Sequence, residues 1–182
     1  MKNPLVEKIL FLRVKNKDHE AYGQFYDLYV ERIYRFIFFK VNSEEDAKDL
    51  TSEVFLKTWQ YLKADKPIKN LNAFVYMVAR NSVIDFYRSK SKKDIAEEFV
   101  SNIADNDLAS RLLDQQLADS ETAELLTALK TLKEEYREAI TLHYLDELNI
   151  KEISLILQKS PGAVRVLIHR ALNALKATLK KS

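Results

Sequence analysis

The last thirty residues of the chain hold six lysine and arginine side chains and one histidine, but none of the 27 acidic residues. A segment with this charge attracts the phosphate backbone of a nucleic acid. Asn149 and Ser160 are good N-caps, and Pro161 suits the first position of the helix that Ser160 would start. We therefore expect helices at 150–157 and 161–180 to form a DNA-reading helix–turn–helix. A solvated basic helix is the alternative.

The second of these helices has an apolar stripe along one side and basic side chains beside it. Arg165, His169 and Lys176 lie off the stripe, where they can meet phosphates or base edges. Gln158 is the weak point of the pattern, because a short helix–helix turn often needs a positive φ and uses glycine. The stripe consists of Val164, Ile168, Ala171, Leu172 and Leu175.

A second group of charged residues lies on a helix expected at 44–63, with Ser43 as its N-cap. Asp46, Asp49 and Glu53 follow one another at spacings of three and four, so they share one side of this helix. An acidic strip with apolar borders is typical of a protein-docking surface, where charge orients the partner and apolar groups anchor it. An ordinary solvated acidic helix explains the composition equally well. The apolar borders are Leu50, Leu56, Phe55 and Trp59, and Leu50 also belongs to the stripe that fixes the helix in its domain.

A third group combines aromatic and basic side chains on a helix expected from 71 to 89 or slightly beyond. Aromatic rings with nearby guanidinium groups suit unpaired bases, and lysines suit backbone phosphates. We expect Phe74 to pack in the core and Tyr76 to remain available for stacking. The group comprises Tyr76, Arg80 and Tyr87 on one side, Asn81, Asp85 and Arg88 on the next, and then Lys90, Lys92 and Lys93.

Helices must position these groups, since 182 residues with two glycines and three prolines leave little room for tight turns. We expect an all-α protein of two small helical domains, at 1–94 and 120–182, joined by an acidic linker at 95–119. With 47% hydrophobic residues the chain can build their cores. The helices are expected at 5–14, 18–40, 44–63, 71–89, 121–132, 134–144, 150–157 and 161–180.

Composition argues against several kinds of site. The chain has no cysteine, which excludes disulfides and thiolate metal sites. Its three histidines, His19, His143 and His169, belong to no E-x-x-H or H-E-x-x-H pattern, so we expect no metal, no cofactor and no catalytic site. No apolar run approaches the length that crosses a membrane, so we expect a cytoplasmic protein without stable membrane insertion.

Four runs in series resemble a small factor of the sigma-70 family of RNA polymerase. The extracytoplasmic-function group, which keeps only regions 2 and 4, fits best, and the similarity covers about 22–180 in the right order and spacing. It implies a region 2 helical bundle in the first domain and a region 4 helix–turn–helix in the second. The runs are D-A-K-D-L-T-S-E-V-F-L-K-T-W at 46–59, A-F-V-Y-M-V-A-R-N-S-V-I-D-F-Y-R at 73–88, Y-R-E-A-I-T-L-H-Y at 136–144 and P-G-A-V-R-V-L-I-H-R-A-L at 161–172.

The resemblance implies core RNA polymerase as the protein partner, through its β′ clamp helices and its β flap. In such factors the first run docks on the clamp helices. The acidic linker would occupy the nucleic-acid channel of the polymerase, where its negative charge resembles that of RNA. Members of the family are commonly held by an anti-sigma factor, which adds such a protein to the candidate partners. The residues that would bind the polymerase are Asp46, Asp49, Leu50, Glu53 and Phe55.

Promoter DNA is the implied nucleic acid. The second run would melt and read the minus-ten element, and the loop at 64–70 would help to hold a flipped base. The minus-ten contacts would be Tyr76, Arg80, Asn81, Arg88, Lys92 and Lys93. The last run would read the minus-thirty-five element. Its contacts would be Ser160, Arg165, Val166, Leu167, His169 and Arg170.

The chain departs from the family pattern in two helices. Phe74 stands where the family often has tryptophan, and Val166 and Leu167 stand where small polar or basic residues are common. Apolar side chains cannot exchange hydrogen bonds with bases, but they can contact thymine methyl groups. We therefore predict that Leu167 reads T-rich positions, so that uracil in place of thymine in the minus-thirty-five element would weaken binding.

Two other classes of protein compete with this interpretation. A conventional helix–turn–helix repressor or activator would bind a ligand or dimerise through its first domain, but it has no need for an acidic docking strip and an aromatic–basic helix. An enzyme or metal protein would need a nucleotide loop or a nucleophile–base pair, which the sequence lacks. A sigma factor of this kind would bind promoters weakly alone, because two modules on a flexible linker gain avidity only when the polymerase fixes their spacing.

Overall fold

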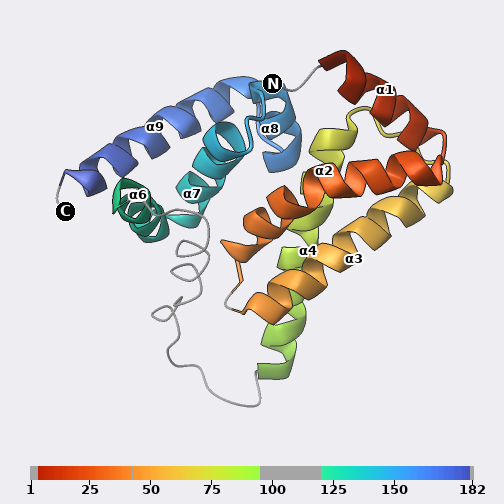
Figure 1. Cartoon of the computed structure of the whole chain (residues 1–182). Helices are drawn as coiled ribbons and strands as arrows, with labels where there is room; N and C mark the ends of the chain where they lie inside the picture. Colours follow the sequence, from red (N-terminus) through yellow and green to blue (C-terminus); the bar gives the residue numbers. More distant parts are fainter. Residues whose placement is uncertain (1–3, 42, 95–119, 181–182) are drawn as a thin grey trace.

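The computed structural model describes residues 4–41, 43–94 and 120–180, in which all regular structure is helical, as the all-α prediction requires. The predicted acidic linker at 95–119 lies outside the described residues. The first half of the chain holds α1 (Pro4–Lys15), α2 (His19–Phe38), α3 (Glu44–Lys63) and α4 (Leu71–Asp94) (Figure 1). The second half holds α6 (Ser120–Thr131), α7 (Glu134–Ile140), the π-helix η1 (Thr141–Leu145), α8 (Ile150–Leu157) and α9 (Pro161–Leu179).

The first half is a bundle in which α1 packs on α2, α2 on α3 and α3 on α4 (Figure 1). Local signals start two of these helices. Asp18 accepts a hydrogen bond from Ala21 N at 3.0 Å before α2, and Ser43 Oγ accepts one from Asp46 N at 3.2 Å before α3. The buried side of α2, with spacings of three and four, lies at the centre of the bundle. Its large members are Phe25, Tyr29, Ile33, Phe36 and Ile37.

The second half is built around α8 and α9, which form the predicted helix–turn–helix. Glu152 Oε2 accepts a hydrogen bond from Asn149 N at 3.0 Å and closes a capping box at the start of α8. Gln158 adopts the left-handed φ of 54° that the turn needs, so the turn forms without glycine. Ser160 then caps α9. A separate core of α6, α7 and α9 supports the pair and contains Ala128, Leu129, Leu132, Ile140, Ala171 and Leu175.

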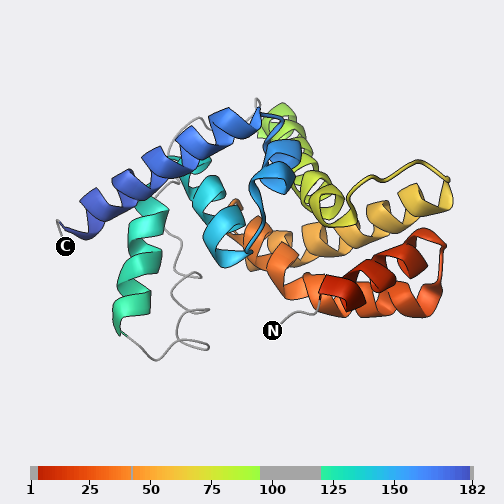
Figure 2. The same cartoon turned by 90° about the horizontal axis from the view of Figure 1, so that it is seen from above.

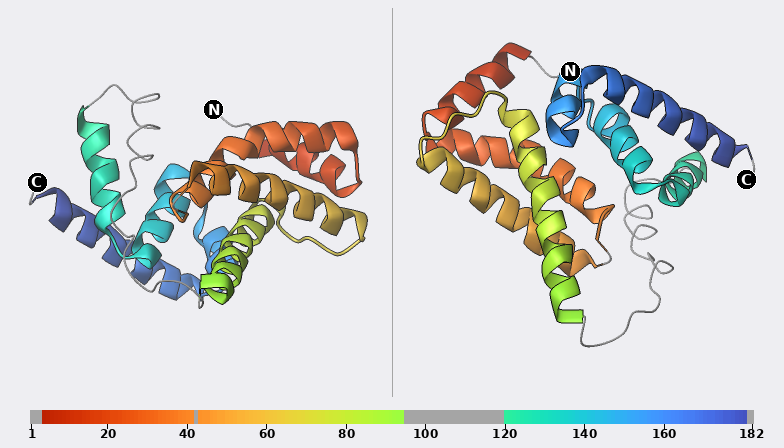
Figure 3. Two further views of the ribbon diagram at one scale, coloured as in Figure 1. Left: turned by 90° about the horizontal axis from the view of Figure 1, so that it is seen from below. Right: turned by 180° about the vertical axis from the view of Figure 1, so that it is seen from behind.

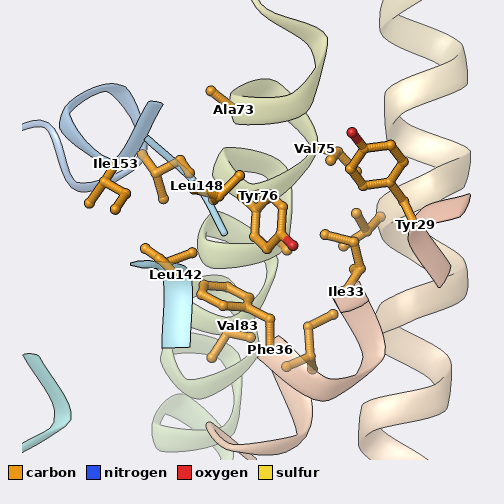
Figure 4. Packing of buried hydrophobic residues seen from close by; sticks show 14 of the residues in the cluster. Tyr29, Ile33, Phe36, Ala73, Val75, Tyr76, Val83, Leu142, Leu148 and Ile153 are labelled. Carbon is orange, nitrogen blue, oxygen red and sulfur yellow. The ribbon is translucent and has the colours of Figure 1, made fainter. Parts of the chain in front are cut away.

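The two halves pack against each other, and α8 lies against α4 (Figure 2 and Figure 3). One continuous buried core crosses the boundary between them. At close range, Leu142, Leu148 and Ile153 of the second half lie on the side of α4 that carries Tyr76 (Figure 4). The helix that was predicted to read the minus-ten element therefore also forms part of the boundary between the halves.

Candidate nucleic-acid interface

The exposed side of α9 carries most of the predicted minus-thirty-five contacts. Arg165, His169 and Arg170 are exposed, and so is Val166, at 50%. Ser160 is exposed as well, and its Oγ accepts a hydrogen bond from the backbone at the start of α9. The arrangement presents two guanidinium groups, an imidazole and one apolar side chain along the first half of a helix. Such a set suits phosphates and base edges in a DNA groove.

Leu167 does not lie on that side of α9. Its side chain is 7% exposed and belongs to the same buried core as Val164 and Ile168. The prediction that it reads thymine is therefore wrong for this fold. The spacing explains why, since position 167 is three after Val164 and four before Ala171, and both of these residues are fully buried. Val166 is the apolar residue of the pair that remains at the surface.

The acidic strip on α3 keeps its charges at the surface but not its predicted anchors. Asp49 and Glu53 are exposed, and Asp46 is half-buried. Leu50 and Phe55 are 5% and 4% exposed, because both belong to the core of the first half. They cannot anchor a partner while the bundle stays folded, so this part of the prediction is wrong.

Two other apolar side chains lie at the surface, Leu56 beside the strip and Tyr26 where α2 packs on α3. Leu56 is 57% exposed, and it follows Glu53 by three positions, so the two share one side of α3. Tyr26 of α2 is 40% exposed, and its ring lies 4.7 Å from that of Phe55. The sequence marked Leu56 as a border of the strip. It gave no sign of Tyr26, which only the packing of α2 on α3 brings there.

α4 presents part of the predicted aromatic–basic surface. Asn81 and Arg88 are exposed, and Arg88 Nη1 lies 3.8 Å from Asp85 Oδ1. Lys92 and Lys93 belong to the same helix, but their side chains lie outside the described residues. The exposed side of α4 thus offers an amide and a guanidinium group to a nucleic acid.

Tyr76 is fully buried, so the prediction that it is available for stacking is wrong in this arrangement. Its ring meets that of Phe36 edge-on at 5.4 Å, and the second half of the chain covers it (Figure 4). Burial raises the pKa of Tyr76, and the negative charge of Asp146 acts in the same direction. Phe74, which was expected in the core, is half-buried, and its ring lies 4.6 Å from that of Tyr61.

The loop between α3 and α4 borders a hollow of about 280 Å³. Lys66 Nζ lies 5.3 Å from the centre of the Tyr61 ring, and Lys17 forms an ion pair of 2.6 Å with Asp65, which ties the end of α1 to the loop. The hollow combines cationic and apolar walls, which suit a phosphate and a base, with the carboxylate of Asp65, which is paired with Lys17. Sequence reasoning missed Lys15, because no local pattern brings α1 to this loop. The lining includes Lys15, Lys66, Pro67, Ile68 and Lys69.

Charged side chains also lie on the boundary between the halves. Arg80 is one-third exposed, and its Nε lies 3.3 Å from Glu138 Oε1, which also lies 2.9 Å from Lys40 Nζ. Arg35 donates a hydrogen bond of 2.5 Å to Asp146. Burial raises the pKa of Asp146, and the positive charge of Arg35 opposes that shift. Arg80 is therefore already paired within the chain, which its position in the sequence could not indicate.

Within the described ranges, no group of three or more histidine and carboxylate side chains could hold a metal ion. None of the helices in those ranges is long and apolar enough to cross a membrane. His143 Nδ1 lies 3.1 Å from the carbonyl oxygen of Leu148, and His169 Nδ1 lies 3.4 Å from the side-chain amide of Asn173.

Family models match both halves of the chain: Sigma-70 region 2 at residues 25–93 and Sigma-70 region 4 at residues 122–175. The chain is 30% identical over 174 residues to the ECF RNA polymerase sigma factor BldN of Streptomyces coelicolor, with 92% of this chain and 63% of that protein covered. It is 31% identical over 156 residues to the ECF RNA polymerase sigma factor SigM of Bacillus subtilis, with 85% and 92% covered. The chain thus spans less than two thirds of BldN but nearly all of SigM.

Two solved structures share the fold. CnrH, solved in complex with the cytosolic domain of CnrY, has a TM-score of 0.69 and 23% identity over 96% of this chain and 97% of that chain. The sigma factor RpoE of Bartonella quintana, solved in complex with the anti-sigma factor NepR, has a TM-score of 0.71 and 20% identity over 88% and 98%. The sequence matches to both regions, together with those to whole relatives, decide the assignment: this chain belongs to the sigma-70 family and is a sigma factor of the extracytoplasmic-function group.

Proposed function

We propose that this sigma factor brings core RNA polymerase to promoters through three separate surfaces, on α3 for the polymerase and on α4 and α9 for two DNA elements. The exposed basic side of α9 carries the proposal furthest. Arg165, His169 and Arg170 project from a capped helix that α8 supports, which is the arrangement that a helix–turn–helix uses in a major groove. The chain supplies sequence preference, and the polymerase supplies the chemistry.

The polymerase would bind a ridge formed by Asp49, Glu53, Leu56 and Tyr26, which we call the docking ridge. Its two carboxylates can orient a basic partner, and its leucine and tyrosine can supply the apolar contact in which binding free energy concentrates. The proposed partner is the pair of clamp helices of the β′ subunit. Asp46 lies half-buried near one end of the ridge.

The minus-ten element would lie along the exposed side of α4. Asn81 can exchange hydrogen bonds with an unpaired base, and Arg88, with Lys92 and Lys93 beyond it, can contact phosphates. The hollow at the loop 64–70 would receive a flipped base. Its volume of about 280 Å³ is close to the lower limit of small-molecule sites, about 300 Å³.

The minus-thirty-five element would receive α9 in its major groove. Arg165 and Arg170 suit phosphates or guanine edges, and His169 lies between them on the helix. Val166 takes the place of Leu167 as the proposed contact to a thymine methyl group. The β flap of the polymerase is the proposed partner of the unit at 120–182.

The remaining parts of the proposal concern the linker and regulation. The polymerase would hold two units of the chain apart, residues 1–94 and residues 120–182. Residues 95–119 would lie in its nucleic-acid channel. An anti-sigma factor is a proposed inhibitor, supported by the anti-sigma factor NepR bound to the structurally similar RpoE. Because the proposed function requires promoter DNA and core polymerase, we propose that the chain acts in the cytoplasm.

In-vitro transcription with core polymerase across a promoter library tests this function. We expect start sites that depend on the chain and share two sequence elements at fixed spacing. Glu53→Lys should abolish these transcripts, because it reverses a charge of the docking ridge. Glu45→Lys, which makes the same charge change at another exposed position of α3, should retain them. A library without chain-dependent start sites would contradict the proposal.

A further inference from the structure

Lys15, the last residue of α1, lines the hollow beside the loop 64–70. This helix ends before residue 25, where the first family match begins, so neither matched region includes it. The core of the first half nevertheless fixes α1. Val14 is fully buried, and the ring of Phe11 lies 6.1 Å from that of Phe25. Lys15 therefore borders the hollow because the fold holds the end of α1 there.

The charges around the hollow are mostly positive. Lys15, Lys66 and Lys69 line it, and none of the three forms an ion pair among the described residues. The one carboxylate among the lining residues is Asp65, and Lys17 pairs with it at 2.6 Å. Because this pair neutralises Asp65, the three lining lysines give the hollow an excess of positive charge, which attracts a polyanion.

Both residues of this ion pair have an unusual backbone conformation. Lys17 has a φ of 63° and Asp65 a φ of 54°, in the left-handed region that glycine adopts most easily. Their side chains are 38% and 77% exposed, so the pair contributes little to stability. Left-handed residues other than glycine cluster at functional sites. Here they join the turn after α1 to the start of the loop, beside the hollow.

The rest of the lining is apolar and consists of Leu62, Pro67 and Ile68. In a nucleotide of a single strand, the base makes apolar contacts, and the phosphates on either side of it meet positive charges. The hollow offers both kinds of contact. It therefore suits one nucleotide, with the base among the apolar side chains and a phosphate beside a lysine.

We infer that Lys15 contacts a backbone phosphate of the single-stranded minus-ten element, next to the base that the hollow receives. The inference rests on the proposed function, because it adds a contact from α1 to the proposed minus-ten site. Lys66 and Lys69 approach the same nucleotide from the loop. The N-terminal helix thus becomes part of the DNA-binding surface, which α4 and the loop would otherwise form alone.

Such a contact has a definite signature. A lysine that neutralises a phosphate reads no base, so its loss lowers the affinity for every sequence by about the same factor. The contact also releases counterions from the strand, so its loss weakens the salt dependence of binding. A lysine that only supports the fold would change the stability of the chain and leave the salt dependence as it is.

Binding of a single-stranded oligonucleotide by the holoenzyme tests this signature, with the minus-ten sequence selected from the promoter library. Lys15→Gln should lower the affinity about two- to fivefold, as for an exposed ion pair. It should also reduce the slope of log affinity against log salt by about 0.7. Lys15→Arg keeps the charge and should retain both values. Lys8→Gln is the matched control, because Lys8 is exposed on α1 and does not line the hollow.

Uncharged methylphosphonate linkages locate the contact on the strand. Each phosphate of the oligonucleotide is replaced in turn, and the native and Lys15→Gln holoenzymes are compared. At one position the native holoenzyme should lose about two- to fivefold in affinity, while the Lys15→Gln holoenzyme should lose nothing further. At every other position the two holoenzymes should respond alike.

The outcomes separate the contact from the function on which it rests. Equal salt slopes for the native and Lys15→Gln holoenzymes, or equal responses at every methylphosphonate position, would overturn the contact. If the native holoenzyme binds the oligonucleotide no better than core polymerase alone does, the proposed function fails instead.

Discussion

The two helices that we propose to face DNA in this sigma factor present their side chains differently. On α9, Arg165, His169 and Arg170 are all exposed. On α4, Tyr76 is buried and Arg80 is paired with Glu138. α9 lies along one edge of the molecule, whereas α4 packs between α3 and α8 (Figure 1 and Figure 3). The residues that α9 exposes follow from its own sequence. The residues that α4 exposes depend also on α8, whose Glu152 lies eighty positions after Asn72 of α4.

The largest expected effect is a loss of stability when Tyr76, the fully buried tyrosine of α4, is replaced. Tyr76→Ala removes a fully buried ring from the boundary, so the free energy of unfolding should fall by about 3–5 kcal/mol. Urea denaturation followed by circular dichroism measures this loss. Tyr76→Phe is the control, since it keeps the buried ring and removes only the hydroxyl. A Tyr76→Ala chain of native stability would show that the ring is not held in the core.

The next prediction separates the two neighbouring apolar residues of α9. Leu167→Ala should lower the free energy of unfolding by about 2–4 kcal/mol, because it leaves a cavity in the core. Val166→Ala should change stability by less than about 0.5 kcal/mol, because Val166 is half exposed. If Val166 contacts thymine, its truncation should abolish the difference in holoenzyme binding between promoters with thymine and uracil in the minus-thirty-five element. Equal stability losses for the two variants would contradict the assignment of sides.

On α3, the comparison is between the exposed Leu56 and the buried Leu50. Leu56→Ala should weaken binding to core polymerase by about 1–2 kcal/mol and leave the stability of the free chain nearly unchanged. Leu50→Ala should do the reverse and destabilise the bundle. Competition for core polymerase against a labelled native chain measures the first effect. Native affinity of the Leu56→Ala variant would remove Leu56 from the docking ridge.

The smallest effect concerns the turn that sets the orientation of α9. Gln158 has a φ of 54°, a conformation that glycine adopts without the steric cost of a β-carbon. Gln158→Gly should therefore raise the free energy of unfolding by about 0.5–1 kcal/mol. Gln158→Ala keeps the β-carbon and should give no such gain. Thermal denaturation of both variants measures the difference, and destabilisation by glycine would contradict the turn geometry.

Local sequence signals predicted the helices well. Asn149, Ser160 and Ser43 all cap helices where their side chains indicated. One expected helix, at 134–144, is instead α7 followed by the π-helix η1, because no residue type marks a π-turn. The sequence predicted two separate domains, and no pattern in it indicated that they share a core.

The site residues were harder to predict, for two physical reasons. Leu50 and Leu167 lie on buried stripes at helical spacing, so the sequence contained the signal that they are core residues. The burial of Tyr76 and the pairing of Arg80 have no local signal. They depend on Glu138, Leu142 and other residues that approach α4 only in the folded chain.

Transcription from one promoter with either element altered tests the central claim most directly, namely that α4 and α9 contact two different DNA elements. Asn81→Ala should make transcription by the holoenzyme insensitive to changes in the minus-ten element while it still responds to the minus-thirty-five element. Arg165→Ala should show the opposite pattern, at a cost of about 1–3 kcal/mol in promoter binding. If both variants lose sensitivity to the same element, or the chain directs no transcription at all, the account is contradicted.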